Sequence, residues 1–341
     1  MSLPIAFIQG LEMQNGDTVL AGDVGGTKTN LAIFKKTGNE MAVMKEGSFV
    51  SKGFSGIIEM MQEFLSGDTV PGIISLGVAG PVQDGKVNIT NLSQQIDVRE
   101  IAQYFNVEKI YLLNDLEATA YGVAALSDKD VHILLEGGKN SVGNIAIMAP
   151  GTGLGEAGMF WDGGYFHPFA TEGGHSDFAA RTEPDILLYR YLQKKFGHVS
   201  WERVVSGPGI INLYEFLRDV MKIDEPQGLV NRKNDEDFAV TISKNALNKK
   251  SAICTETMNL FFRYLAEEAA NLVLKLKATG GVFIGGGILP EVYELLQKDC
   301  FQKSFCNSGR MNTLLKEVPV KIILNEKTAL LGAASYVVYG K

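Results

Sequence analysis

Two glycine-rich turns, each between two strand-like segments, constrain the fold of this chain more than any other feature. The segments AGDVGGTKTNLAIF at 21–34 and AIMAPGTGLGEAGMF at 146–160 align at an offset of 125 residues, which matches Thr27 with Thr152. Each reads as a buried strand, a turn and a returning strand. The repeat predicts a duplicated α/β domain, with one glycine-rich turn in each half and a cleft between the halves.

Strand-like and helix-like segments alternate along the rest of the chain, as is typical of α/β proteins. Strands are expected at 18–24, 30–36, 73–80, 110–114, 144–151, 280–287 and 320–325. Helices are expected at 56–65, 115–126, 183–195, 207–221, 256–277 and 328–339. The polar segment 223–238 is expected to be a solvated loop, and the pattern assigns no role to 1–17.

Length and composition bound the function. The 341 residues suffice for two ordinary domains, and 45% hydrophobic with 21% charged residues is typical of a soluble globular protein. A net charge of −7 argues against a nucleic-acid partner. The longest apolar runs are too short for a membrane span, and the N-terminal segment has no signal-peptide pattern. Cys254, Cys300 and Cys306 form no CxxC pair, so we expect no zinc site or disulfide framework and a cytoplasmic protein.

The first glycine-rich turn, GDVGGT at 22–27, has the composition of a phosphate-binding loop. Glycines let backbone N–H groups approach phosphate oxygens closely. A carboxylate such as Asp23 would repel a polyphosphate unless a cation lies between them, which makes Asp23 a candidate for holding hydrated Mg²⁺. From this segment alone, a plain hairpin turn with an ordinary Asp explains the pattern equally well.

Two other nucleotide-binding motifs are not supported. The chain contains no GxxxxGK[ST] P-loop. A GxGxxG spacing occurs at Gly153, Gly155 and Gly158, but the following residues MFWDGGYFH are aromatic and glycine-rich and do not begin a helix. Dinucleotide-binding folds require a helix N-terminus at that point, so we interpret this match as incidental.

Six segments in a fixed order resemble the bacterial glucokinase family, within the superfamily of sugar kinases, actin and heat-shock ATPases. They are GDVGGTKTNLAIF, LLNDLEATAYG, APGTGLGEAG, EGGHSDFA, ERVVSGPGIINLY and GGVFIGGGILP, and the resemblance extends from about residue 18 to the C-terminus. Repressor-type sugar kinases carry a cysteine-rich zinc motif after their sugar-binding histidine. This chain has no cysteine before Cys254, which excludes that subfamily.

The resemblance implies two α/β domains of the actin-like ATPase (ribonuclease H-like) type that flank an interdomain cleft. By analogy, residues 18–125 with 326–341 form a small domain and 126–325 a large one. The resemblance also implies that ATP contacts Gly22, Asp23, Val24, Gly25, Gly26, Thr27, Gly151, Thr152, Gly153, Gly285, Gly286 and Gly287. The family's first loop usually ends in Thr-Asn, whereas Lys28 follows Thr27 here, and we expect Lys28 to point to solvent.

The resemblance makes Asp115 the catalytic base and Asn114 a sugar ligand. Asp115 lies where the strand-like IYLLN meets a helical segment, and from the local sequence alone a helix cap is the more probable role. The family motif NDLEATAYG reverses that preference.

The remaining sugar ligands implied by the family are Asn91, Glu172, His175 and Glu202. Carboxylates bind adjacent hydroxyls well because each offers two acceptor oxygens. Without the family, Asn91 reads as a turn residue, His175 as structural and Glu202 as a solvated residue at a helix start. Thr171 replaces the usual Gly before Glu172. The other histidines, at 132, 167 and 198, are expected to be structural or exposed.

We therefore predict a glycolytic, ATP- and Mg²⁺-dependent glucokinase that phosphorylates the 6-hydroxyl of glucose, with a homodimer implied by the family. Two alternatives stay open: a kinase for another hexose, and a sugar-sensing protein without catalysis. About 20 residues precede the first turn, too few for a helix-turn-helix domain, which disfavours a regulator. An actin-like or chaperone-like ATPase would leave the EGGHSDF segment without a role.

Overall fold

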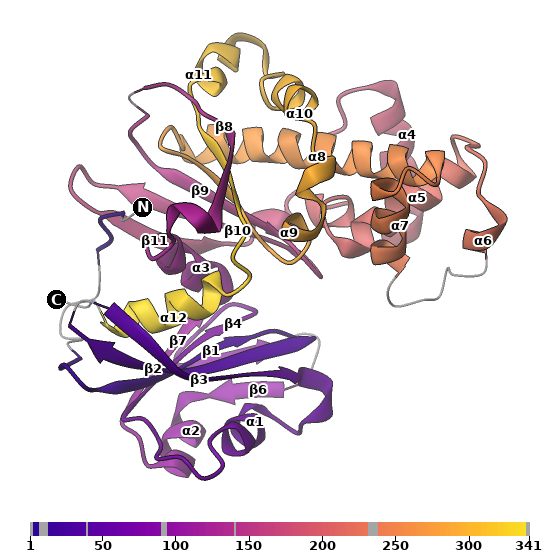
Figure 1. Cartoon of the computed structure of the whole chain (residues 1–341). Coiled ribbons are helices and arrows are strands. Elements are labelled where there is room, and N and C mark those ends of the chain that lie inside the picture. Colours follow the sequence, from indigo (N-terminus) through magenta and orange to yellow (C-terminus); the bar gives the residue numbers. More distant parts are fainter. Residues whose placement is uncertain are drawn as a thin grey trace. The chain divides into compact units, whose positions relative to one another are not determined.

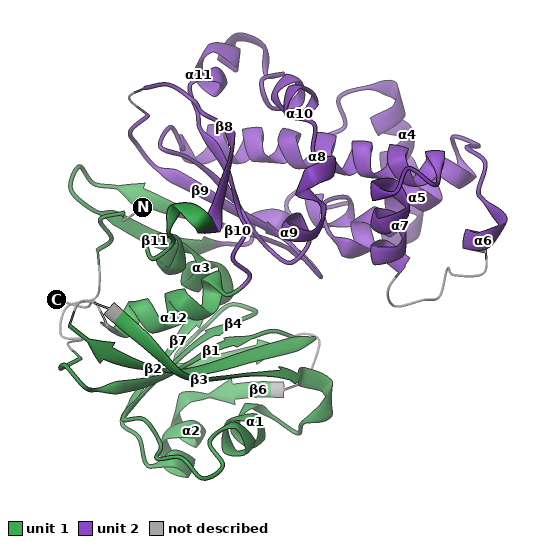
Figure 2. Ribbon diagram, in the orientation of Figure 1, with its two compact units in different colours: residues 1–129, 159–170, 327–341 green, residues 130–158, 171–326 purple. Residues whose placement is uncertain are grey.

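A computed structural model describes residues 3–6, 13–38, 40–89, 94–139, 141–230 and 238–338 (Figure 1). The chain forms two compact units, coloured separately in Figure 2. The first unit comprises residues 1–129, 159–170 and 327–341, and the second comprises 130–158 and 171–326.

The first unit contains a five-stranded sheet in the order β3-β2-β1-β4-β7. Its strands are β1 (Thr18–Val24), β2 (Lys28–Thr37), β3 (Glu40–Val50), β4 (Ile73–Val78) and β7 (Lys109–Asn114). β1, β4 and β7 are parallel, whereas β1–β2 and β2–β3 are antiparallel. All six residues of β4 are buried, as expected of a central parallel strand that is covered on both faces.

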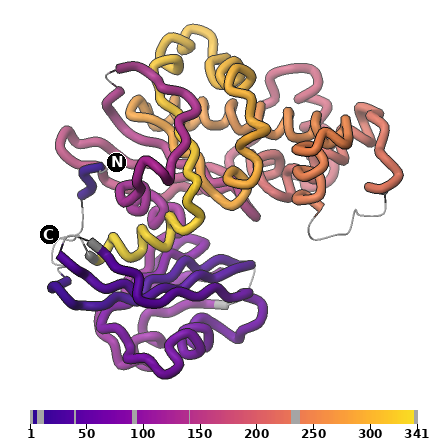
Figure 3. Tube along the Cα trace, viewed as in Figure 1, coloured from indigo at the N-terminus to yellow at the C-terminus, as the bar shows by residue number. Residues whose placement is uncertain are grey.

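Helices and a small hairpin complete the first unit. They are α1 (Ile57–Phe64), α2 (Val98–Phe105), α3 (Asp115–Val123), α12 (Thr328–Val338), β5 (Lys86–Ile89) and β6 (Gln94–Asp97). The C-terminal helix α12 packs on α3, β1 and β4, so segments from opposite parts of the sequence lie side by side in this unit (Figure 3). A Cβ at Gly122 would clash with the Thr328 carbonyl oxygen, and one at Gly332 with the Ala118 carbonyl oxygen. Glycine therefore permits the close approach of α3 and α12.

The second sheet has the order β11-β10-β9-β12-β13-β8. Its strands are β8 (Val131–Leu135), β9 (Ile145–Pro150), β10 (Leu154–Trp161), β11 (Phe166–Thr171), β12 (Gly281–Ile284) and β13 (Val320–Ile323). β9, β12 and β13 are parallel. The first five strands in this order, β11-β10-β9-β12-β13, correspond one for one to β3-β2-β1-β4-β7 of the first sheet. This repeated topology agrees with the sequence repeat.

Most helices belong to the second unit. They are α4 (Glu183–Phe196), α5 (Gly207–Asp219), α6 (Gln227–Val230), α7 (Phe238–Leu247), α8 (Ala252–Leu276), α9 (Leu289–Val292), α10 (Lys298–Phe305) and α11 (Asn312–Lys316). The 25-residue α8 packs against β9, β12 and other helices, and its apolar face forms the centre of the larger core. The side chain of Ser251 caps its N-terminus, and Lys277 ends it in the left-handed conformation.

The helices and strands expected from the sequence are all present, with ends that differ by a few residues. The expected solvated loop at 223–238 is partly wrong, because α6 forms within it. Leu229 gives the reason, since its side chain is 5% exposed and packs into the larger core. Residues 231–237 lie outside the described part of the chain. The GxGxxG spacing at 153–158 lies mostly in strand β10, which confirms that it is not a dinucleotide-binding turn.

Candidate functional site

The first glycine-rich turn joins β1 to β2 in the first unit. The Gly25 N–H donates to the Lys28 carbonyl at 3.1 Å, and a Cβ at Gly25 would lie 2.9 Å from that oxygen. Ser51 fixes the turn from outside, since its hydroxyl donates to the Gly25 carbonyl at 2.7 Å and its N–H to the Thr27 carbonyl at 3.0 Å. Thr27 and Lys28 are exposed, as expected for Lys28. The turn is therefore preorganised, with its outer residues accessible to a ligand.

Asp23 is the last but one residue of β1, and its carboxyl group is held from the neighbouring strand. The Asn30 amide donates to Asp23 Oδ2 at 3.4 Å, and the Ser48 hydroxyl donates to Asn30 Oδ1 at 2.8 Å. Burial raises the pKa of the Asp23 carboxyl, while the Asn30 hydrogen bond and the charge of Lys28 lower it. A carboxylate that is partly desolvated in this way gains from a nearby cation.

Asn114 and Asp115 lie at the junction of β7 and α3. Asn114 is the helix cap: its Oδ1 accepts from the Leu116 N–H at 2.9 Å, while its amide donates to the Gly80 carbonyl at 3.2 Å. Asp115 is the first residue of α3, and its Oδ1 accepts from the Leu116 N–H at 2.9 Å. The cap that the local sequence predicted for Asp115 is thus made mainly by the residue before it.

Parallel pairing brings these groups to one edge of the first sheet. β1, β4 and β7 run in register, so that Val24 pairs with Val78 and Val78 with Asn114. A Cβ at Gly77 would lie 2.8 Å from the Cβ of Ala118 in α3, and the Asp115 Cα and the Gly22 carbonyl oxygen both lie within 4 Å of the same position. The absence of a side chain at Gly77 therefore lets α3 pack closely on β4. Ligands of α/β folds bind at this carboxyl edge.

The second glycine-rich turn joins β9 to β10 in the second unit. The Gly151 N–H donates to the Gly153 carbonyl at 2.8 Å, and the Gly207 N–H donates to the Gly151 carbonyl at 2.8 Å. Glu202 contacts the same turn, because its Oε2 accepts from the Leu154 N–H at 3.0 Å. A Cβ at Gly153 would lie 2.5 Å from that oxygen. Glu202 and the start of α5 are therefore both attached to the turn.

The segment that carries Glu172 and His175 lies beside Glu202. The Trp201 N–H donates to the Ser176 carbonyl at 3.0 Å, and the Phe178 N–H to the Val199 carbonyl at 2.9 Å. Gly174 is buried, and a Cβ there would clash with the carbonyl oxygen of Leu154. These contacts gather the three predicted sugar ligands of this unit around the end of the Gly151–Gly153 turn. Glu172 and His175 are exposed and accessible to a sugar.

Thr171, which stands where the family usually has Gly, has a structural role. Its hydroxyl donates to the Glu156 carbonyl at 3.0 Å and accepts from the Gly173 N–H at 3.2 Å. The side chain thus attaches the start of the loop to β10.

The third glycine cluster follows β12 and meets the second turn. The Gly285 N–H donates to the Met148 carbonyl at 2.8 Å, and Ile284 pairs with Met148 in the parallel sheet. Gly286 has a φ of 78°, and a Cβ there would clash with the Pro150 carbonyl oxygen. Gly287 has open space at its Cβ position. The backbones of these two glycine-containing segments therefore lie close together, with few side chains between them and a ligand.

Asn91, the remaining predicted sugar ligand, lies outside the described residues. The histidines without motif support are exposed as expected: His167 pairs with Asp162 at 2.6 Å, His198 pairs with Asp177 at 2.9 Å, and His132 packs beside Tyr293.

The sequence reasoning missed the residues that hold the site from behind. Asn30, Ser48 and Ser51 support the first turn, and Ser206 caps α5 beside the second. Ser206, followed by Gly-Pro and an apolar run, carries a recognisable helix-start pattern. Asn30 and Ser48 come together because β2 pairs with β3, and Ser51 reaches the first turn from the segment directly after β3.

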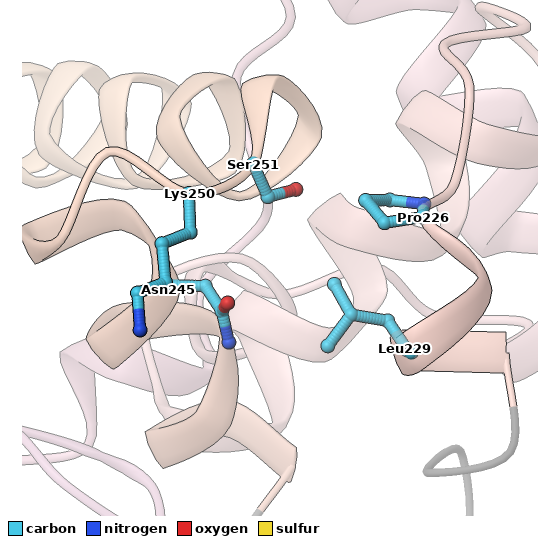
Figure 4. A pocket seen from close by; sticks show the side chains of 6 residues that line it. Pro226, Leu229, Asn245, Lys250 and Ser251 are labelled. Carbon is cyan, nitrogen blue, oxygen red and sulfur yellow. The ribbon is translucent and has the colours of Figure 1, made fainter.

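Two cavities occur away from these residues. One of about 200 Å³ (Figure 4) is lined by Pro226, Gly228, Leu229, Asn245, Lys250 and Ser251. The other, of about 560 Å³, lies where β1, β4 and β7 begin, at the edge opposite Asp23 and Asn114. Neither contains a predicted site residue.

Within the described ranges, no helix is long and apolar enough to cross a membrane. The same residues contain no cluster of three or more His, Cys, Asp or Glu side chains that could hold a metal ion by itself.

Comparisons with known proteins agree on one family. A sequence model described as glucokinase matches residues 20–339. A curated glucokinase from Nostoc punctiforme is 35% identical over 93% of this chain and 97% of its own length. The crystal structure of a glucokinase from an Antarctic psychrotroph is 32% identical, with a TM-score of 0.79 over 94% of this chain and 98% of that chain.

A more distant structure shares the fold. It is a ROK family glucokinase from Streptomyces griseus, crystallised in complex with glucose and AMPPNP. Its identity is 18%, with a TM-score of 0.63 over 93% of this chain and 98% of that chain.

Proposed function

The chain belongs to the glucokinase family and has the fold of the actin-like sugar kinases, and we propose that Asp115 is the base with which it phosphorylates glucose. The enzyme is an ATP-dependent hexose kinase. The observation that carries the assignment is the position of Asp115 at the carboxyl edge of the first sheet, the edge at which β1 ends with Asp23 and the first glycine-rich turn, one strand away from β7.

The proposed reaction is a direct transfer. The oxygen of the 6-hydroxyl bonds to the γ-phosphorus, the bond between that phosphorus and the β–γ bridging oxygen breaks, and ADP leaves. Asp115 accepts the hydroxyl proton. The backbone N–H groups of the two glycine-rich turns stabilise the charge that spreads over the phosphoryl oxygens.

The proposed sugar ligands are Asn91, Asn114, Glu172, His175 and Glu202. The contacts among 153–154, 171–178 and 199–202 support this proposal for the last three, because they hold both acidic residues and the histidine on one short stretch of the second unit. Carboxylates are suited to this role because they accept hydrogen bonds from sugar hydroxyls.

The nucleotide ligands are proposed to be residues 22–27, 151–153 and 285–287. The exposure of Thr27, Thr152 and Gly286 supports this assignment. Mg²⁺ neutralises phosphate charge when it is bound with ATP, and the partly desolvated carboxyl of Asp23 suits it as a ligand through water. Asn30 would then fix the direction of that carboxyl.

We also propose that the protein acts in glycolysis in the cytoplasm, as a homodimer. The compartment is supported by three cysteines that are free in the structure and by the need for ATP. The homodimer is supported by the resemblance to the family alone. The partners are glucose, ATP and a second copy of the chain.

A coupled assay for ADP release across a panel of hexoses tests the substrate. Glucose should give the highest kcat/KM, and another hexose in that place would contradict the choice of sugar. Asp115→Asn should lower kcat by about 10²–10⁴ while glucose binding is kept, because the amide cannot take the proton. Asp299→Asn is a matched control, since Asp299 lies in the first turn of α10. A variant with more than a tenth of the wild-type kcat would refute the role of Asp115.

A further inference from the structure

Two buried carboxyl groups lie directly behind the loop that carries Glu172 and His175. Glu156 is in β10 and Glu268 is in α8, and both residues are 0% exposed. The Glu268 oxygens are engaged: one accepts from the Asn271 amide at 2.8 Å and the other from the Lys275 ammonium at 3.1 Å. Neither oxygen of Glu156 has a donor at hydrogen-bond distance among the described residues. Glu156 is thus a buried acid without a cationic partner of its own in that part of the chain.

The surroundings of Glu156 favour its neutral form. Burial, together with the negative charge of Glu268, raises the pKa of Glu156 to about 8. The positive charge of Lys275 acts in the opposite direction and lowers this pKa. Burial also raises the pKa of Glu268, against the hydrogen bonds of Asn271 and Lys275 and the charge of Arg181. Two carboxyl groups in one desolvated space hold a single proton between them.

The carboxyl group of Glu156 contacts the backbone of the loop. A Cβ at Gly173 would clash with Glu156 Oε2, so the carboxyl group lies directly against the backbone at Gly173. The Thr171 hydroxyl donates to the Glu156 carbonyl at 3.0 Å, which fixes the loop to the same residue of β10. Gly173 begins the short helical turn Gly173–His175, and Glu172 is its N-terminal cap residue. Any movement of the Glu156 side chain therefore acts on the backbone between Glu172 and His175.

From these contacts we propose that Glu156 and Glu268 share one proton and that this neutralised pair positions Glu172 and His175 for sugar binding. The inference rests on the proposed sugar site. Glu156 contacts neither the sugar nor ATP in this scheme, so it is a positioning residue.

Loss of the shared proton explains how the pair would act on sugar affinity. Ionised Glu156 would place a second negative charge in a space that contains Glu268 and the half-exposed cation Lys275. The repulsion would displace the Glu156 side chain toward Gly173, the backbone segment that already touches it. Glucose binding should then weaken as Glu156 ionises, whereas kcat, which depends on Asp115, should change much less.

The test measures glucose binding to the full-length protein by calorimetry without nucleotide, from pH 6.5 to 9.5. If only the protonated form holds the loop, the wild-type Kd for glucose should rise about tenfold between pH 7 and pH 9, because the neutral fraction of an acid with a pKa of about 8 falls about tenfold over that range. Glu156→Gln should abolish this rise, since an amide cannot ionise and still donates to Glu268. A variant profile parallel to that of wild type would overturn the proposal.

Thermal unfolding provides a second readout for the same variant. An acid whose pKa is higher in the folded than in the unfolded state loses stability as pH rises from the unfolded value, 4.5, to the folded value, about 8. The melting temperature of wild type should therefore fall relative to that of Glu156→Gln across this range. Should Glu156→Gln not fold, Glu268→Gln should move the midpoint of the Kd rise to lower pH, because the like charge is gone. An unmoved midpoint would overturn the proposal.

Two further variants separate this inference from its premise. Glu267→Gln removes another buried acid of α8 whose neighbours are Arg263, Arg181 and Asp185, and it should keep the wild-type pH profile. Flattening by Glu267→Gln would overturn the specific role of the pair. Glu172→Gln should weaken glucose binding at every pH. If Glu172→Gln weakens glucose binding while Glu156→Gln leaves the pH profile unchanged, only the positioning role of Glu156 is refuted. If Glu172→Gln does not weaken glucose binding, the proposed sugar site and this inference are both refuted.

Discussion

Substitution of Glu202 can separate its contact with Leu154 from its proposed role as a sugar ligand. Its Oε2 accepts from the Leu154 N–H at 3.0 Å, and Leu154 is only 5% exposed. Glu202→Ala leaves that N–H without a protein acceptor, which costs about 1–3 kcal/mol. At about 2–4 °C per kcal/mol for a unit of this size, the melting temperature should fall by about 2–12 °C. Glu202→Gln should have a much smaller effect, because the amide oxygen can still accept from Leu154.

Sugar affinity should respond differently from stability. In Glu202→Gln the amide oxygen remains with Leu154 and the NH₂ group replaces the second carboxylate oxygen, so a charge-assisted bond to a sugar hydroxyl is lost. Such bonds are worth about 1.5–3 kcal/mol, which corresponds to an increase of about 10- to 150-fold in KM for glucose. Both Glu202 variants should show this increase.

The assays are differential scanning calorimetry and initial rates at varied glucose with saturating ATP. Glu291→Gln, an exposed residue of α9, serves as the control and should match wild type in both. Wild-type KM in Glu202→Gln would refute the sugar contact. An unchanged melting temperature in Glu202→Ala would show that the bond to Leu154 contributes nothing to stability.

Two further predictions concern the first unit. Asp23→Ala should raise KM for Mg-ATP by about tenfold or more and leave glucose affinity without nucleotide unchanged; equal losses of both ligands in calorimetry would indicate a folding defect instead. Gly122→Ala should lower the melting temperature, because a Cβ would clash with the Thr328 carbonyl oxygen and overpacking costs about 1–3 kcal/mol. Gly228→Ala, in helix α6 with open space at its Cβ position, is the control and should be neutral or stabilising; equal effects of the two would exclude the clash as the cause.

The local sequence pattern was sufficient to predict a strand or helix where the segment is buried on both faces or begins with a clear capping residue. β4 is buried along its whole length, and β1 matches its expected bounds, because a continuous apolar run between turn residues is typical of a buried parallel strand. The strand β3 was not predicted. Val43, Met44 and Val50 in it are more than half exposed, so the usual alternation of buried and exposed residues is absent.

The residues that hold the glycine-rich turns in place could not be predicted from the sequence, because they act through contacts between segments that are distant in the chain. Ser51 holds the Gly25 carbonyl from 26 residues away, and Glu202 accepts from Leu154 across 48 residues. Nothing local distinguishes these side chains from solvated ones. Only strand register and packing bring them within hydrogen-bond distance.

The sequence by itself determined the duplicated α/β architecture, the two glycine-rich turns and the family, since each depends on residue type at fixed local spacing. Tertiary structure alone decided that Asn114 makes the helix cap that local sequence assigned to Asp115, and that Thr171 attaches the loop carrying Glu172 and His175 to β10. It also decided that Glu156 is a buried acid behind Gly173, where the local pattern places only one more residue of a strand. The charge state of such a group is set by desolvation and by neighbours from other elements, which a one-dimensional pattern does not contain.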